Sequence, residues 1–357
     1  METKLSLLSR KEQFQQLFPS EPSYRWKQIE TAFFDGHANG WQDVQTLPKS
    51  VREGVEQEIL WMTVETEQVY DSKQSQTFKA ILKTRDGLFF ETVLMENRTG
   101  QWTICVSSQI GCAMRCSFCA TGTMGLKRSL LSDEIVDQYR FWMSFLKARP
   151  EISQRISNVV FMGMGEPMAN YENVKQAIRM WLTYTDIGST HITVSTVGIL
   201  TQLDRLLTDP DWPSVRIAIS LHSANQEKRR EIIPTTVDDF LVKLADWSHR
   251  YAETLGNRKH HVTYEYLLLN KVNDGLDEAK ELAQFIRSTS SGKINVIPYN
   301  PVPDKPFERS QRECIDQFKN ILVLAGLDVT ERRSMGNDIA AACGQLVTTK
   351  KNVQERS

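Results

Sequence analysis

The spacing of apolar residues changes along the chain and divides it into regions of different predicted structure. Up to about residue 60 the apolar positions recur at helical intervals, as with Trp26, Ile29 and Phe33. Three short apolar runs then follow, of a kind typical of strands. The pattern predicts an N-terminal helical accessory domain over residues 1–60 and a short-strand linker region over residues 61–97.

From about residue 98 onward, apolar runs alternate with amphipathic stretches, which is typical of repeated βα units and a parallel sheet. The six predicted strands are "TICVSS" (103–108), "SNVVFMG" (157–163), "HITVST" (191–196), "VRIAIS" (215–220), "VTYEYLLL" (262–269) and "KINVIP" (293–298). No short internal repeat interrupts them. We therefore expect one α/β unit, built as a barrel-like or an open parallel sheet.

Three long helices are predicted between or after these strands. The first should begin at Ser132, a capping residue followed by Asp133 and Glu134. The second should start near Thr236 and end at Gly256, and the third should cover about 310–326. Each carries apolar residues at helical spacing, so each should pack one face on the sheet.

The totals for the chain set limits on what the protein can be. Its 357 residues, 40% of them hydrophobic, suffice for one large domain with an appendage. The start, "METKLSLLSRKEQ", fits neither a secretory signal nor a membrane span, and no later apolar stretch reaches spanning length. We expect a cytoplasmic protein that does not contact a membrane.

A net charge of −1 gives no overall positive field, so affinity for nucleic acid would depend on local basic patches. Four candidates stand out, although short charge runs are more often simply solvated surface. They are "GLKR" (125–128), "EKRR" (227–230), "NRKHH" (257–261) and "ERR" (331–333).

Four of the six cysteines lie between Cys105 and Cys119. In a reducing compartment such crowding favours metal ligation or catalysis over disulfides. Cys112, Cys116 and Cys119 have the spacing C-x3-C-x2-C, directly after the first predicted parallel strand, where such sheets hold their active sites. The three cysteines are thus candidates for metal ligands.

Three thiolates on a four-iron cluster leave one iron open, and the amino and carboxylate groups of S-adenosylmethionine (SAM) could fill that position. Electron transfer to SAM would then give a 5'-deoxyadenosyl radical. One alternative is a zinc site with a distant fourth ligand such as His222, although zinc sites usually present paired C-x2-C knuckles. The other is three buried cysteines without a special role.

Further motifs extend along nearly the whole chain in a fixed order. They are "FET" (90–92), "CVSSQIGC" (105–112), "MGMGEP" (162–167), "STVG" (195–198), "SLH" (220–222), "VND" (272–274), "IPYNP" (297–301) and "DIAAACGQL" (338–346). With the cysteine loop, this set resembles the radical SAM superfamily and, within it, the RlmN/Cfr family of RNA adenine methyltransferases. The resemblance implies a partial (β/α)6 radical SAM barrel over residues 98–338 and a C-terminal tail, 339–357, with a methyl-accepting cysteine.

The resemblance also implies roles for individual residues. Cys112, Cys116 and Cys119 would ligate a [4Fe-4S] cluster. The expected SAM contacts are Gly165, Glu166, Ser195, Ser220, Leu221, His222 and Asn300. A glycine-flanked turn at a strand end lets backbone approach a ligand, and a carboxylate there can hold an ammonium group.

The mechanism that the resemblance implies uses two SAM molecules per turnover. The first methylates Cys343, and the second yields the radical that removes hydrogen from the new methyl group. After that carbon adds to adenine, Glu91 would accept the ring proton. Cys105 would then attack Cys343 and release the methylated RNA, leaving a disulfide for a reductant to reopen.

The implied substrate is an adenosine of 23S rRNA in the peptidyl transferase centre, with tRNA as a second target. Pro167 after "GE" is typical of the RlmN branch, which acts on C2, whereas the Cfr branch tends to carry alanine and acts on C8. "IIPTT" (232–236) and Ala340 depart from the usual family pattern. We expect a monomer with an electron donor such as flavodoxin and its reductase; the rival outside enzymes is a noncatalytic metal-containing RNA-binding module.

Overall fold

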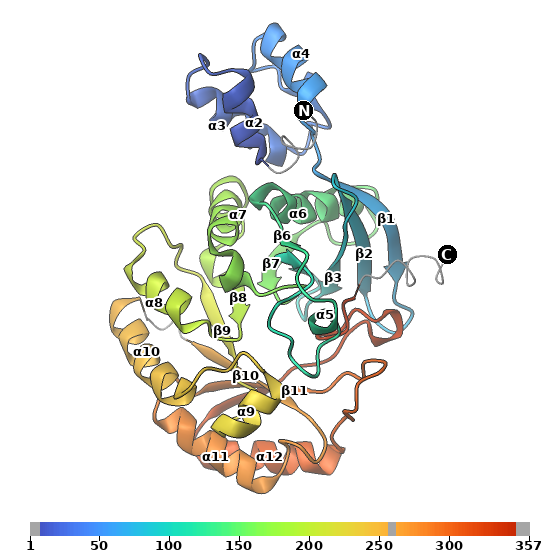
Figure 1. Ribbon diagram of the computed structural model, residues 1–357. Coiled ribbons are helices and arrows are strands. Elements are labelled where there is room, and N and C mark those ends of the chain that lie inside the picture. The colour runs from blue at the N-terminus through green and yellow to red at the C-terminus, as the bar shows by residue number, and fades with distance from the viewer. Residues whose placement is uncertain (1–7, 256–261, 348–357) are drawn as a thin grey trace.

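The computed structural model describes residues 8–255 and 262–347. A ten-stranded sheet runs through it, and a small helical module lies at one end (Figure 1). In spatial order the strands are β1 (Val64–Asp71), β2 (Thr77–Thr84), β3 (Phe89–Glu96), β4 (Trp102–Cys105), β7 (Ile156–Phe161), β8 (Ile192–Thr196), β9 (Arg216–Ser220), β10 (Thr263–Leu268), β11 (Lys293–Pro298) and β12 (Asp328–Glu331). A separate two-stranded ribbon joins β5 (Gln109–Ile110) to β6 (Arg128–Ser129).

The predicted α/β fold is confirmed, because all six predicted runs form neighbouring parallel strands, from β4 and β7 to β11. Helices follow the strands, and the long ones cover the outside of the sheet (Figure 1). They are α5 (Ala120–Thr123), α6 (Ser132–Lys147), α7 (Tyr171–Tyr184), α8 (Leu200–Thr208), α9 (Gln226–Ile232), α10 (Phe240–Thr254), α11 (Leu276–Arg287) and α12 (Arg312–Leu324). Short 3-10 turns are η1 (Trp41–Asp43), η2 (Pro167–Asn170), η3 (Ser189–His191) and η4 (Asn337–Ile339).

The three strands expected as a linker, β1 to β3, extend the main sheet. β3 pairs antiparallel with β4, placing Val93 opposite Cys105. Beyond the sixth run, β12 adds a parallel strand that the pattern did not indicate. Its residues are half-buried or exposed, so it contains no apolar run by which it could be recognised. The proposed domain boundaries inside the chain stay a prediction.

Two helix starts differ from the prediction. Leu131, not Ser132, caps α6, and its N–H donates to the Glu134 carboxylate at 2.8 Å. The helix expected near Thr236 begins at Phe240. The unpredicted helix α9 precedes it, because "QEKRREI" is too short and too charged to show an apolar stripe. No helix in the described ranges is long and apolar enough to cross a membrane.

The N-terminal module has its own core, separate from that of the sheet. Helices α2 (Arg10–Leu17), α3 (Tyr24–Phe34) and α4 (Lys49–Glu58) enclose it. As predicted, Trp26, Ile29 and Phe33 are buried. Aromatic rings dominate this core, and Phe33 packs edge-on against Trp41 and Trp61.

Buried charges join this module to α6. Asp137 lies 3.0 Å from the Arg10 guanidinium and 2.6 Å from that of Arg140. Both guanidinium groups donate to the Trp61 carbonyl and stack over the Phe33 ring. Although burial alone would raise the pKa of Asp137, the charges of Arg10 and Arg140 hold it below its usual value. The ionised carboxylate therefore fixes the module on the sheet.

Replacing Asp137 with alanine should loosen this junction, because the buried Arg140 would lose its carboxylate partner and Arg10 would keep only Asp133, at 3.3 Å. We expect a loss of about 3–5 kcal/mol in the free energy of unfolding, measured by urea denaturation, and faster proteolysis before β1. As a control, Lys49→Ala removes an exposed ion pair with Glu53 and should cost less than about 1 kcal/mol. Equal stability of the two variants would contradict this account of the junction.

Candidate active site

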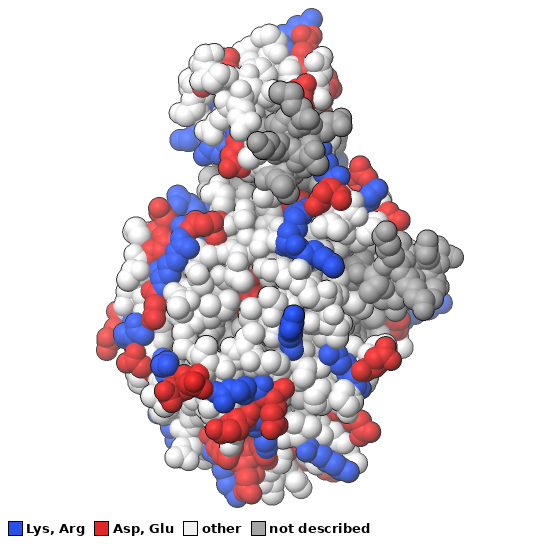
Figure 2. Space-filling model, viewed as in Figure 1, with Lys and Arg blue, Asp and Glu red and all other residues white. Residues whose placement is uncertain are grey.

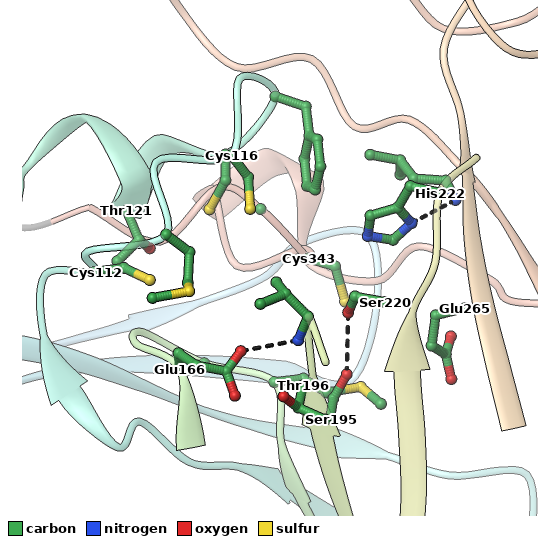
Figure 3. A pocket seen from close by; sticks show the side chains of 18 of the residues that line it. Cys112, Cys116, Thr121, Glu166, Ser195, Thr196, Ser220, His222, Glu265 and Cys343 are labelled. Atoms are coloured by element: carbon green, nitrogen blue, oxygen red, sulfur yellow. Dashed lines mark hydrogen bonds between the residues drawn. The ribbon is translucent and has the colours of Figure 1, made fainter. Parts of the chain in front are cut away.

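A cavity opens at the carboxyl ends of the parallel strands. Figure 3 shows its polar side chains converging from the cysteine loop and from the ends of β7 to β10. Nine of the predicted site residues line it: Cys112, Cys116, Cys119, Gly165, Glu166, Ser195, Ser220, His222 and Cys343. The fold thus collects in one space residues that are spread over more than half of the chain.

The cysteine loop lies between β5 and α5, with Cys112 and Cys116 buried and Cys119 half-buried. Burial raises the pKa of Cys112 to about 12 and that of Cys116 well above its usual value. The backbone N–H of Ser117 donates to the Ile232 carbonyl at 2.9 Å, which ties the loop to α9. In the described residues no three Cys, His, Asp or Glu groups converge on a single-ion site. All three cysteines of the loop line the cavity.

The turn after β7 brings Glu166 to the cavity floor (Figure 3). Its two oxygens accept hydrogen bonds from the Met168 N–H at 3.0 Å and the Val197 N–H at 2.9 Å. Burial raises the pKa of Glu166. Gly165 has φ +98°, and a Cβ there would lie 2.5 Å from the Gln109 Cβ. Contact with Gln109 at the start of β5 already requires this glycine, before any ligand is considered.

Ser195 and Ser220 end the neighbouring strands β8 and β9, with their hydroxyls 3.4 Å apart. His222 follows with φ +58°. Its Nδ1 accepts the Leu267 N–H at 3.1 Å, so in the neutral ring the proton sits on Nε2. Phe118 packs edge-on against this ring. Burial, and secondarily the charge of a nearby arginine, lowers the pKa of His222 to about 3, so the ring is neutral at physiological pH.

The C-terminal segment crosses beside α5 and brings an exposed Cys343 into the same cavity (Figure 3). Two contacts with α5 hold the segment: the Ala120 N–H donates to the Gly344 carbonyl at 2.8 Å, and the Thr121 hydroxyl to the Leu346 carbonyl at 2.6 Å. The Asn300 amide donates to the Cys343 carbonyl at 3.3 Å. Asn300 therefore contacts this segment.

Four predicted site residues do not line the cavity: Asn300, which contacts the C-terminal segment, and Leu221, Cys105 and Glu91. Leu221 is fully buried, so it can contribute only its backbone. Cys105 is buried in β4; burial raises its pKa, and a negative charge on Cys343 would raise it further. Glu91 is buried in β3, where its carboxylate lies 3.1 Å from Lys79 Nζ and accepts the Val347 N–H at 3.0 Å.

Sequence reasoning missed Glu265 and Arg332, which line the cavity beside Cys343. Glu265 accepts a hydrogen bond from the Asn295 amide at 2.8 Å and lies 3.6 Å from the Arg332 guanidinium. The sequence does contain a signal for Glu265, because this residue is a lone charge within the apolar run "VTYEYLLL". An acid at such a position needs a partner or a function.

The basic patches are less available for RNA than the sequence indicated. Figure 2 shows basic and acidic side chains interspersed over the visible face. Arg128 forms ion pairs with Asp86 at 2.7 Å and Glu134 at 2.8 Å. The interpretation of "EKRR" as a surface patch is wrong for Arg229, which is buried. The patch "NRKHH" (257–261) lies outside the described residues.

Comparisons with known proteins agree on one family. The Radical SAM superfamily profile matches residues 106–286. Two curated relatives, from Aquifex aeolicus and Chlorobium phaeovibrioides, are each named "Probable dual-specificity RNA methyltransferase RlmN". The first is 37% identical, covering 99% of this chain and 98% of the relative; the second is 41% identical, covering 91% and 87%. A crystal structure of a radical SAM methyltransferase from Sphaerobacter thermophilus has a TM-score of 0.85 at 36% identity, covering 96% of this chain and 98% of that one.

Replacing His222 with asparagine should change the pH dependence of stability. In the unfolded chain the histidine takes up a proton below about pH 6.5, whereas in the folded chain it does so only near pH 3. The wild type therefore loses stability as the pH falls from about 6.5 toward 3. Asparagine can accept the Leu267 N–H but does not titrate in this range.

Between about pH 7 and pH 5, urea unfolding should show a loss of stability that is greater by about 2 kcal/mol in the wild type than in H222N. Both proteins should be measured without metal or SAM, so that only the ring's titration differs. Equal losses would show that His222 is not held neutral by the fold.

Proposed function

This chain belongs to the radical SAM superfamily and, within it, to the RlmN family of RNA methyltransferases, and we propose that it methylates C2 of an adenosine in 23S rRNA, with tRNA as a second target. A radical SAM enzyme uses a [4Fe-4S] cluster and SAM, and an RNA methyltransferase acts on RNA. One observation carries the proposal for this chain's residues: the cysteine loop, the Glu166 turn and Cys343 share a single cavity.

The donor set fits the implied cofactors. Cys112, Cys116 and Cys119 would hold the cluster, which when bound supplies the electron that cleaves SAM. Glu166 is buried and its carboxylate faces the cavity, so it would hold the SAM ammonium group. His222 would offer its Nε2–H as a donor from the opposite wall, since Nδ1 is already occupied.

Cys343 would serve as the methyl carrier. Adenine C2 is a poor nucleophile, so direct displacement at the sulfonium methyl is unfavourable, whereas a thiolate accepts that methyl readily. In the first half-reaction the Cys343 sulfur would form a bond to the methyl carbon, and S-adenosylhomocysteine would leave with the sulfonium electron pair. A second SAM would be consumed in activating this methyl group, which makes two per turnover.

Glu91 and Cys105 would complete the reaction after the methyl carbon has joined the ring. Glu91 would accept the ring proton, and Cys105 would attack the Cys343 sulfur, forming a disulfide and breaking the bond between sulfur and the RNA-linked carbon. A two-electron reductant must then restore both thiols.

We propose flavodoxin and its reductase as the electron donors of the enzyme. Because the Val347 N–H occupies a Glu91 oxygen, the C-terminal segment must shift for a base to approach it.

The choice of C2 rests on Pro167, the residue typical of the RlmN branch after "GE", and the Cfr-like alternative is C8. An adenosine in a loop would be the easier target, because extracting it from its stack costs less. The exposed Lys127 and the N-terminal module are the proposed phosphate contacts.

Replacing Cys343 with alanine should abolish RNA methylation, because the variant has no sulfur to carry the methyl group. Intact-mass analysis of the wild-type protein should show a single added methyl, absent from C343A. The matched control is Cys314→Ala, which removes a half-buried cysteine on α12 outside the cavity and should leave both readouts unchanged. Full methylation of RNA by C343A would eliminate the proposed mechanism.

The product itself distinguishes the two ring positions. Nucleoside mass spectrometry of rRNA and tRNA, from cells with and without the gene, should show 2-methyladenosine that depends on the gene in both RNA classes. Gene-dependent 8-methyladenosine would instead support the Cfr-like alternative. Loss of the product from rRNA alone would remove tRNA from the proposal.

A further inference from the structure

Arg229 is a buried cation that the proposed chemistry has not used. It lies in the short helix α9, inside the "EKRR" run, yet its side chain is only 1% exposed. Its guanidinium packs over the Phe240 ring at 3.6 Å. The neighbouring Arg230 is half-buried, with its side chain 42% exposed, and pairs with the exposed Asp238 at 2.5 Å. The burial of Arg229 therefore needs an explanation other than a surface ion pair.

All the hydrogen bonds of this guanidinium go to neutral oxygens. It donates to the Val197 carbonyl at 2.6 Å, the Ser220 carbonyl at 3.3 Å and the Leu221 carbonyl at 3.1 Å. The fourth acceptor is the Thr236 hydroxyl, at 2.6 Å. Within residues 8–255 and 262–347 no carboxylate pairs with Arg229; the one group whose negative charge would favour its ionised form is Cys116, as a thiolate.

Two of these four acceptors, the carbonyls of Val197 and Ser220, belong to residues that line the cavity. The Val197 carbonyl accepts a hydrogen bond from Arg229, and the Val197 N–H donates one to the Glu166 carboxylate. Ser220 and Leu221 lead directly into His222, at the end of β9. The same helix ends at Ile232, whose carbonyl accepts the N–H of Ser117 in the cysteine loop. Helix α9 thus contacts both the strand ends that lead to His222 and the loop that carries the three cysteines.

A guanidinium without an anion is costly in a protein interior, where hydrogen bonds to carbonyls do not neutralise its charge. Burial lowers the pKa of Arg229 to about 9, so it remains ionised at neutral pH. Ligation of a cluster converts three neighbouring thiols to thiolates, and this supplies the missing negative charge.

We propose that Arg229 is a positioning residue that holds the ends of β8 and β9 and provides the positive charge that balances the thiolate-ligated cluster. This rests on the proposed cluster ligands. Reduction adds a negative charge to the cluster, and a nearby buried cation stabilises that charge, so Arg229 should raise the reduction potential. The Thr236 hydroxyl is the one side-chain acceptor among the four groups that hold the guanidinium.

Four variants separate charge from packing. R229Q removes the charge. T236D keeps the guanidinium but places a carboxylate against it, which cancels the charge in place. T236V loosens the same contact without changing charge, and R230Q removes a half-buried neighbouring charge. The readout is the midpoint potential of the cluster, measured by a redox titration followed by electron paramagnetic resonance in the absence of SAM.

In R229Q and T236D we expect at least a tenfold shift toward the oxidised cluster, which for one electron is a fall of about 59 mV. T236V and R230Q should match the wild type. If R229Q does not fold, T236D alone decides, because it retains the guanidinium and its packing. A wild-type potential in R229Q or T236D would overturn the charge-balancing role.

R229K tests the positioning role, since lysine keeps the charge but cannot reach three carbonyls with one planar fork. We expect a potential near that of the wild type and SAM binding weakened at least tenfold in equilibrium dialysis. Unchanged SAM affinity would overturn positioning. A wild-type protein that takes up no cluster would instead refute the proposed function itself, which keeps the two failures distinguishable.

Discussion

The site depends on one docking interaction, that of the C-terminal segment on helix α5. Hydrogen bonds to the Gly344 and Leu346 carbonyls come from Ala120 and Thr121, which follow the last cysteine of the loop. The same turn of chain therefore positions both the candidate metal ligands and the sulfur of Cys343. A parallel sheet alone would place the loop at its carboxyl edge, but it would not bring a residue from the far end of the chain there.

Much of the fold could be predicted, because its central parallel strands bury more than half of their residues and therefore appear as apolar runs. The six runs that formed β4 and β7 to β11 share this property. Elements without it were missed: β12 is a half-buried edge strand, and α9 is a short charged helix. The predicted cap of α6, Ser132, is one residue too late. The Glu134 carboxylate accepts the backbone N–H of Leu131, and this contact does not depend on the side chain at the capping position.

The candidate site was predictable only in part, for a related reason. Motif order identified the residues that line the cavity, but it gave no information on what holds them. The glycine at position 165 illustrates the difference, since its neighbour is Gln109 at the start of β5. The basic runs predicted surface patches for the same reason. The sequence does not show that Arg229 is buried or that Arg128 forms ion pairs with two acidic residues. Such pairing depends on tertiary contacts between distant segments.

Buried charge is what these tertiary contacts have in common. Asp137 is ionised between two arginines, and Glu91 lies beside Lys79. In both places acid and base are already matched within the protein, so the charge there serves to fix geometry or to hold a proton acceptor in place.

Arg229 differs from these pairs because it has hydrogen-bond acceptors but no acid. A protein that folds before it receives its cofactor must tolerate this imbalance, and four neutral acceptors with an aromatic face reduce its cost without removing it. Adding a carboxylate would stabilise the empty protein but would compete for the guanidinium once thiolates formed. An unmatched cation beside the cysteine loop is therefore the arrangement that favours the loaded state over the empty one.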